Sequence, residues 1–95
     1  MKQLPSSIKK KIEKWDTQTE TPAREILRVL QRLGFEVKFS KGGHIVAEHP
    51  SLIDHYGFGK EGKFTIPTIG GRRVKRWYAR EALRAIQIVT EAEDP

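Results

Sequence analysis

Apolar residues recur at helical spacing near the start of the chain. Within residues 5–16, Ile8, Ile12 and Trp15 occupy positions i, i+4 and i+7, and the lysines of the segment lie off that stripe. This pattern predicts a short basic amphipathic helix. The polar residues 16–21 that follow show no periodicity, so we expect a linker or a turn there.

A second helix is predicted over residues 22–33. Thr21 is its expected N-cap, because a threonine hydroxyl can accept a free backbone amide, and Pro22 suits the first helical position. Gly34 can adopt the left-handed conformation that ends a helix. The apolar stripe of this helix consists of Ala23, Ile26, Leu27, Leu30 and Leu33.

Strand patterns follow the second helix. Residues 35–39 alternate between apolar and polar side chains, which is typical of a half-buried strand. The Ser-Lys-Gly-Gly sequence at 40–43 favours a tight hairpin turn, because glycine readily adopts positive φ. We expect a second strand over residues 44–49, and it ends at Pro50, which cannot donate to a strand ladder.

A third strand is predicted over residues 64–66, before Pro67. Residues 51–62 contain three glycines and no clean alternation, so we interpret them as a long hairpin loop or surface insertion. Residues 68–73 carry two further glycines and are predicted to form a loop.

The last helix is predicted from Lys75 to about Glu91. Its expected inward face carries Ala79, Leu83, Ile86 and Val89 or Thr90, and its opposite face carries Arg76, Arg80, Arg84, Gln87 and Glu91. We expect Trp77 to pack in the core and Tyr78 to point outward. The alternative is that both rings stack on nucleobases while neighbouring arginines hold phosphates.

These elements predict an α+β fold, with a three-stranded antiparallel sheet and helices packed on one face in the order helix, strand, strand, strand, helix. We place this domain at residues 21–92, after a basic helical arm and linker at 1–20 and before an acidic tail at 93–95. The 95 residues can close one modest core, which excludes a Rossmann fold or a large barrel.

Composition excludes several function classes. The chain has no Cys, which excludes a disulfide framework, a thiolate zinc site and a Cys nucleophile. No apolar run approaches the roughly 20 residues that span a bilayer, and the first residues lack the apolar region of a signal peptide, so we expect a soluble cytoplasmic protein. Gly57, Gly59 and Gly62 precede a strand, whereas a dinucleotide-binding fingerprint follows one.

The net charge of +6 is distributed unevenly along the chain. Residues 72–85 contain six basic residues against one acid, Glu81. A concentrated positive field of this kind is suited to neutralising the phosphates of a nucleic acid, and a solvated helix face is the alternative interpretation. The basic residues of the segment are Arg72, Arg73, Lys75, Arg76, Arg80 and Arg84.

Histidines are the side chains best suited to exchange protons near neutral pH. His44 is the first candidate, because it directly follows the glycine turn, where no side chain from residues 42 or 43 crowds it. An imidazole there can take the proton from an RNA 2′-hydroxyl or give one to the leaving 5′-oxygen; the alternative is a polar strand residue that faces water. His49 is interpreted as a strand-end residue and His55 as a loop residue. Their spacing matches no usual ligand pattern, so we expect neither a metal nor a cofactor.

Short motifs occur in a characteristic order between Val29 and Ile88. They are Leu30-x-x-Leu33-Gly34-Phe35, Lys41-Gly42-Gly43-His44-Ile45, His49-Pro50, Phe64-Thr65-Ile66-Pro67, and Val74-Lys75 followed by Ala82-Leu83-Arg84-Ala85-Ile86. In these motifs the segment resembles the HicA toxins, small ribonucleases of bacterial toxin–antitoxin systems with a double-stranded-RNA-binding-domain-like (dsRBD-like) fold. The resemblance implies that His44 is the catalytic residue on a turn formed by Gly42 and Gly43. It also implies RNA contacts from Lys41, Lys75, Arg76 and Arg84.

Three hypotheses about function remain open. The first is a metal-independent endoribonuclease, an mRNA interferase, in which His44 acts as general acid or base. The second is a non-catalytic nucleic-acid-binding module of the same fold. It is motivated by the missing second His, since the position of the family's catalytic second His falls on Ile45 here, and by Trp77 and Tyr78. The third is an interaction subunit whose basic arm docks on a partner through Ile8, Ile12 and Trp15.

A HicB-like antitoxin is the partner that would reconcile the third hypothesis with the first, since covering His44 would silence it. The main partner that we expect is RNA. The residues predicted to bind it are Lys41, Gly42, Gly43, Arg72, Arg73, Lys75, Arg76, Arg80 and Arg84.

Overall fold

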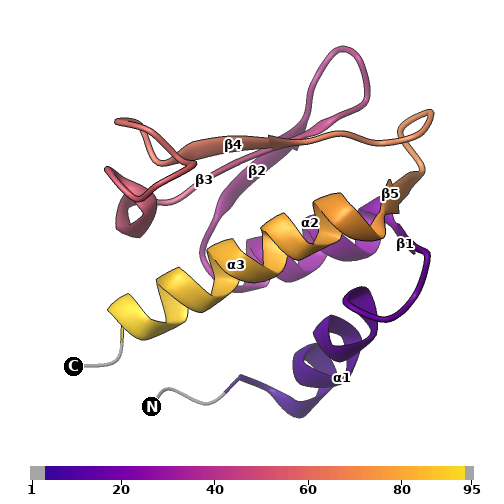
Figure 1. Ribbon diagram of the computed structural model, residues 1–95, viewed down its shortest axis with the longest axis horizontal. Coiled ribbons are helices and arrows are strands. Elements are labelled where there is room, and N and C mark those ends of the chain that lie inside the picture. The colour runs from indigo at the N-terminus through magenta and orange to yellow at the C-terminus, as the bar shows by residue number, and fades with distance from the viewer. Residues whose placement is uncertain (1–3, 94–95) are drawn as a thin grey trace.

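The computed structural model describes residues 4–93 as an α+β arrangement of helices over a small sheet (Figure 1). Residues 1–3 of the expected arm and 94–95 of the expected acidic tail lie outside the described residues. The elements are α1 (Ser6–Trp15), β1 (Glu20–Pro22), α2 (Ala23–Arg32), β2 (Glu36–Phe39), β3 (Ile45–Glu48), a single 3-10 turn η1 (Pro50–Leu52), β4 (Lys63–Ile66), β5 (Arg73–Lys75) and α3 (Arg76–Ala92).

The predicted three-stranded antiparallel sheet is confirmed, with the strand order β2-β3-β4. Its register places apolar side chains on one face and mostly polar ones on the other, because side chains alternate along a strand. α2 and α3 pack against the apolar face (Figure 1). The apolar rows are Val37, Ala47 and Phe64, and Phe39, Ile45 and Ile66; the outer rows are Glu36, Glu48 and Lys63, and Lys38, Val46 and Thr65.

A second, two-stranded sheet was not predicted. β1 pairs antiparallel with β5 in a short ladder, and several of its residues lie where we expected a linker and a loop. Pro22 and Lys75, which we expected as first helical residues, also belong to it, and the helices begin one residue later. Within it, Thr21 lies opposite Val74, and both are fully buried. The prediction of Thr21 as a helix N-cap is therefore wrong. The Ala23 backbone amide donates instead to the Arg72 carbonyl at 2.8 Å, and the Thr21 hydroxyl accepts from the Gln18 side-chain Nε2 at 2.8 Å.

The helix that we expected in an arm belongs to the core. α1 packs against α3 on the side of the helix layer away from the sheet (Figure 1). Ile8 and Trp15 are buried in the same cluster as the inner face of the sheet, and the Trp15 indole N–H donates to a Glu25 carboxylate oxygen at 2.8 Å. The hypothesis that Ile8 and Trp15 dock on a partner is therefore wrong, because the chain buries both side chains itself.

α3 confirms the predicted last helix but turns one aromatic residue outward. Ala79, Ile86 and Val89 are buried as expected, and Leu83 is half-buried. Trp77 is 70% exposed, so its predicted core position is wrong. Successive residues of a helix are 100° apart, so Trp77 lies about 200° from Ala79 and faces away from the core. Tyr78 is half-buried against the core rather than outside it.

The segment between β3 and β4 is a surface insertion, as expected, but the core anchors it at two points. Leu52 and Phe58 are buried, and the Phe58 ring meets Phe64 of β4 edge-on at 5.1 Å between centroids. None of the helices in residues 4–93 is both long and apolar enough to cross a lipid bilayer.

Candidate nucleic-acid interface

A tight turn between β2 and β3 presents His44, as the sequence predicts. Gly43 has a φ of +83° and donates its amide to the Ser40 carbonyl at 2.9 Å. The His44 amide donates to the Ser40 hydroxyl oxygen at 3.2 Å, and the Ser40 amide donates to the His44 carbonyl at 2.7 Å. The turn is therefore fixed by hydrogen bonds on both sides of its two glycines.

Thr68 joins this turn to the loop that follows β4. Its amide donates to His44 Nδ1 at 3.0 Å, and its hydroxyl donates to the Gly43 carbonyl at 2.8 Å. The same hydroxyl oxygen accepts the Gly71 amide at 3.0 Å. A Cβ atom on Gly43 would lie 3.2 Å from Gly71 Cα, so the two backbones approach closely. One threonine thus holds two segments far apart in sequence as a single unit.

This junction brings part of the predicted site together. We define the hairpin-end surface as Lys41, Gly42, Gly43, His44, Arg72 and Arg73. Gly71 lies against Gly43, and Arg72 follows Gly71 in the sequence. The backbone of Arg73 forms an antiparallel bridge with that of Ile69. Lys41, Arg72 and Arg73 are exposed, and within residues 4–93 none of their side chains forms an ion pair. Their charges are available to an anionic ligand.

Arg76 and Arg80 belong to a neighbouring region. The Arg80 Nε atom pairs with Asp16 Oδ1 at 2.6 Å, and an Arg76 Nη atom donates to the Thr17 carbonyl at 3.5 Å. Both side chains therefore tie α3 to the turn after α1. They line a shallow groove with Lys75, whose backbone pairs with Glu20 across the small sheet.

Arg84 is placed differently from the other predicted contacts. Its guanidinium lies 5.0 Å from the centre of the Phe58 ring and 6.0 Å from that of Tyr56. A Cβ atom on Gly57 would lie 3.0 Å from the same guanidinium. Arg84 therefore holds the insertion between β3 and β4 against α3, through a cation–π contact.

The Thr68 bond indicates which ring nitrogen of His44 carries the proton when the ring is neutral. Because Nδ1 accepts the Thr68 amide, the neutral imidazole consistent with this network has its proton on Nε2. The Nε2 atom would lie 3.9 Å from a Cβ on Gly42, so the absence of a side chain at Gly42 leaves this edge of the ring uncovered. In this state His44 presents a hydrogen-bond donor.

The other two histidines have different surroundings. His49 Nδ1 accepts the Ser51 amide at 3.0 Å and so caps η1, and its ring packs 5.2 Å from that of Phe35. This fits its interpretation as a strand-end residue. His55 is exposed on the insertion. Across residues 4–93, no three His, Asp or Glu side chains gather as a metal site would require.

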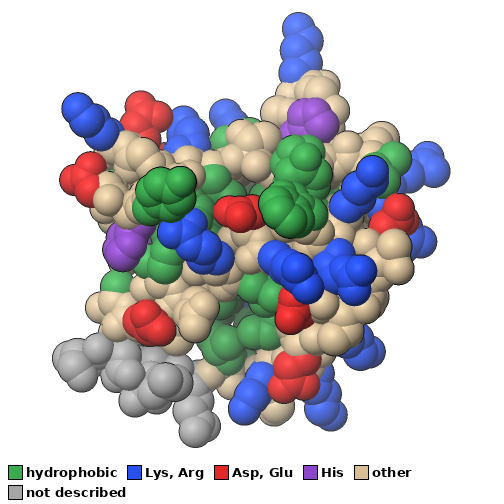
Figure 2. All heavy atoms as spheres, viewed as in Figure 1, with side chains coloured by type: hydrophobic (Ala, Val, Ile, Leu, Met, Phe, Trp, Pro, Cys, Tyr) green, Lys and Arg blue, Asp and Glu red, His purple; other side chains and the backbone are tan. Residues whose placement is uncertain are grey.

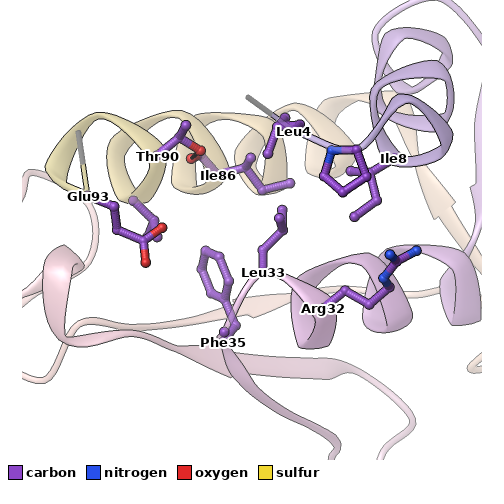
Figure 3. A pocket seen from close by; sticks show the side chains of 11 residues that line it. Leu4, Ile8, Arg32, Leu33, Phe35, Ile86, Thr90 and Glu93 are labelled. Atoms are coloured by element: carbon purple, nitrogen blue, oxygen red, sulfur yellow. Dashed lines mark hydrogen bonds between the residues drawn. The ribbon is translucent and has the colours of Figure 1, made fainter. Parts of the chain in front are cut away.

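An apolar cleft lies away from the predicted site residues. It encloses about 400 Å³ among the start of α1, the junction of α2 with β2 and the last turns of α3 (Figure 3). Leu33 and Phe35 point across it toward Ile86 of α3, and the charged groups of Arg32 and Glu93 lie at its margins (Figure 3). It holds none of the residues predicted to act on RNA.

Sequence reasoning missed Thr68 and the exposure of Trp77. No local pattern marks Thr68, because its partners come from a turn about 25 residues earlier in the chain and from Gly71. The exposure of Trp77 could have been inferred from its position, since it lies on the arginine side of the predicted helix.

Comparisons of the chain with protein-family models, with curated proteins and with solved structures found no match. The family and the function are therefore matters of proposal, and the residues and geometry described above carry them.

Proposed function

We propose that the protein binds RNA through the hairpin-end surface. The observation that carries this proposal is the Thr68 junction, which holds Lys41, His44 and Arg72 at one end of the molecule. These side chains offer positive charge and an imidazole N–H donor to phosphate oxygens, with no acidic residue in the set. In Figure 2, Lys and Arg side chains are numerous on the side of the molecule where β5 and α3 begin.

The proposed fold type is dsRBD-like. The order α2-β2-β3-β4-α3, with both helices on one face of an antiparallel sheet, is the order that this interpretation requires. Proteins of that kind recognise RNA by its shape and by contacts with 2′-hydroxyls and phosphates. The HicA resemblance supports the proposal. Its Lys41-to-Ile45 motif contains His44, and its Phe64-to-Pro67 motif ends directly before Thr68, so the bond between the two residues joins the two motifs.

The proposed activity is metal-independent cleavage of RNA in the cytoplasm, as in a toxin that a HicB-like antitoxin silences. In such a reaction the 2′-oxygen attacks the adjacent phosphorus and the bond from phosphorus to the 5′-oxygen breaks, which leaves a cyclic phosphate and a 5′-hydroxyl. His44 would take the 2′ proton or supply the proton of the leaving oxygen. Either transfer requires His44 to leave the state in which Thr68 occupies Nδ1 and Nε2 is protonated.

The Thr68 bond also favours the second candidate, a non-catalytic binding module. A ring held with Nδ1 as an acceptor can donate from Nε2 to a phosphate oxygen but cannot accept a proton there. Binding without cleavage uses His44 as the structure has it. Cleavage requires His44 to give up its bond with the Thr68 amide.

The test is to incubate the protein with single- and double-stranded RNA in the presence of a chelator, and to measure binding and fragment formation together. A His44→Ala variant is compared with His55→Ala, which removes an exposed imidazole from the insertion. The ribonuclease proposal predicts cyclic-phosphate fragments with the parent and His55→Ala, and none with His44→Ala. Binding without fragments in every sample supports the module, and absence of binding by the parent at low salt contradicts both.

A further inference from the structure

The two tryptophans of the chain have opposite environments. Trp15 is fully buried, and its indole N–H is bonded to Glu25. Trp77, in the first turn of α3, is 70% exposed, and within residues 4–93 its indole N–H has no hydrogen-bond partner. Tryptophan is a large apolar side chain with a polar edge, and such rings are enriched where a protein meets a ligand.

Trp77 lies in the shallow groove already described, beside cationic side chains. The groove is lined by Thr19, Glu20, Lys75, Arg76, Trp77 and Arg80. Asp16 neutralises Arg80, whereas Arg76 meets a backbone carbonyl and keeps its charge. The ring therefore lies next to Lys75 and Arg76, which form no ion pair within residues 4–93, and next to one acid, Glu20, which lies opposite Lys75 across the small sheet.

β5 connects this groove with the hairpin-end surface. Val74 is fully buried, so Arg73 and Lys75, one residue to either side, both project to the exposed side of the strand. Arg73 belongs to the hairpin-end surface, and Lys75 belongs to the groove. Figure 2 shows hydrophobic side chains among Lys and Arg side chains on this part of the molecule. A bound polyanion can thus follow a row of cations from one region to the other.

We propose that Trp77 stacks on an unpaired base of the bound RNA while Lys75 and Arg76 hold the flanking phosphates. This inference rests on the proposed RNA binding and adds a preference for RNA that has an unpaired nucleotide beside a duplex. The faces of paired bases are covered by their neighbours in a duplex, whereas an unpaired base exposes a face on which an aromatic ring can stack. Three basic residues, Lys75, Arg76 and Arg80, line the groove against one acid, Glu20, so its charge favours an anionic ligand.

The experiment compares a blunt RNA duplex with the same duplex carrying a short unpaired tail. We expect the parent to bind the tailed duplex about fivefold to hundredfold more tightly, which is the range that one base–aromatic stack supplies. Trp77→Ala reduces the affinity for the tailed duplex to that for the blunt one, and Trp77→Phe retains part of the preference. Tyr56→Ala, which removes an exposed ring on the far insertion, keeps the full preference.

Tryptophan emission gives a second, independent readout. In the parent, the tailed duplex quenches the emission of the exposed Trp77, whereas in Trp77→Phe the remaining emission comes from the buried Trp15 and does not respond. Because Trp15 is buried only in the folded protein, emission typical of a buried tryptophan also shows that the variant is folded. Equal affinity of the parent for both duplexes, with unchanged emission, overturns the inference and leaves RNA binding intact. Failure of the parent to bind either duplex overturns the proposed function itself.

Discussion

Thr68 makes three hydrogen bonds, which join residues 43, 44 and 71. Two of them use its hydroxyl, so Thr68→Val keeps the shape of the side chain and removes both. We expect this variant to lower the free energy of unfolding by about 1–2 kcal/mol, because the Gly43 carbonyl and the Gly71 amide lose their partner. The same change weakens RNA binding, since the hairpin turn and Arg72 are no longer held together.

The matched control for this prediction is Thr68→Ser, which keeps the hydroxyl. Urea unfolding and RNA titration of the two variants measure the two effects. If Thr68→Val were as stable as Thr68→Ser and bound RNA as well, the junction would not organise the site.

Gly43 and Gly70 provide a second comparison. Both have positive φ, at +83° and +59°, so an alanine at either position costs about 1 kcal/mol or more of backbone strain. A Cβ on Gly43 would also lie 3.2 Å from Gly71 Cα, whereas one on Gly70 meets nothing within 4 Å. We therefore expect Gly43→Ala to lower the midpoint of thermal unfolding more than Gly70→Ala does. Equal midpoints would mean that the two backbones do not need to approach so closely.

Single residues show where sequence reasoning succeeds. The uncovered ring edge of His44 can be predicted from its position directly after Gly42 and Gly43, because that information is local. The tautomer of the same ring does not follow, because it depends on an amide 24 residues later. The prediction of His44 as a proton-transfer group therefore remains a prediction. It carries the condition that His44 gives up its bond with the Thr68 amide.

At the level of elements, α1 is the clearest difference between expectation and structure. The spacing of Ile8, Ile12 and Trp15 predicts the helix but does not say what its apolar face covers. The structure packs that face on α3, so Ile8→Ala should lower the free energy of unfolding by about 2–4 kcal/mol. Lys9→Ala, on the exposed face of the same helix, should change it by less than about 0.5 kcal/mol.

Chemical denaturation of these two variants checks the prediction. Similar small effects from both would show that α1 is a separable arm after all.

The sequence predicts those elements whose own residues show a helical or an alternating apolar pattern. α2, α3 and the three strands of the main sheet each contain several apolar residues at helical or alternating spacing. β1 and β5 have three residues each, too few for a pattern, and each exists because the other supplies its hydrogen-bond partners. Thr21 illustrates this limit: its sequence context is that of a helix cap, but pairing with Val74 places it in a strand.

At the level of the whole molecule, the basic residues predicted to bind RNA divide into four groups with different surroundings. Arg84 holds the insertion, and Arg80 pairs with Asp16. Lys75 and Arg76 line the groove beside Trp77, and Lys41, Arg72 and Arg73 at the hairpin end form no ion pair within residues 4–93. The sequence predicts the cluster of charge but not this division. The partners of Arg80 and Arg84 are distant in sequence: Asp16 follows α1, and the rings of Tyr56 and Phe58 belong to the insertion.

The most direct test of RNA binding at the hairpin-end surface is the salt dependence of duplex RNA affinity. The double variant Arg72→Gln/Arg73→Gln is compared with Lys9→Gln/Lys10→Gln, which removes the same charge from the exposed face of α1. We predict that the first double variant binds more weakly and reduces the slope of log affinity against log salt by about 2, since each phosphate contact contributes about 1. The α1 double variant should keep the slope of the parent. Equal slopes for the two double variants would contradict RNA binding at the hairpin end.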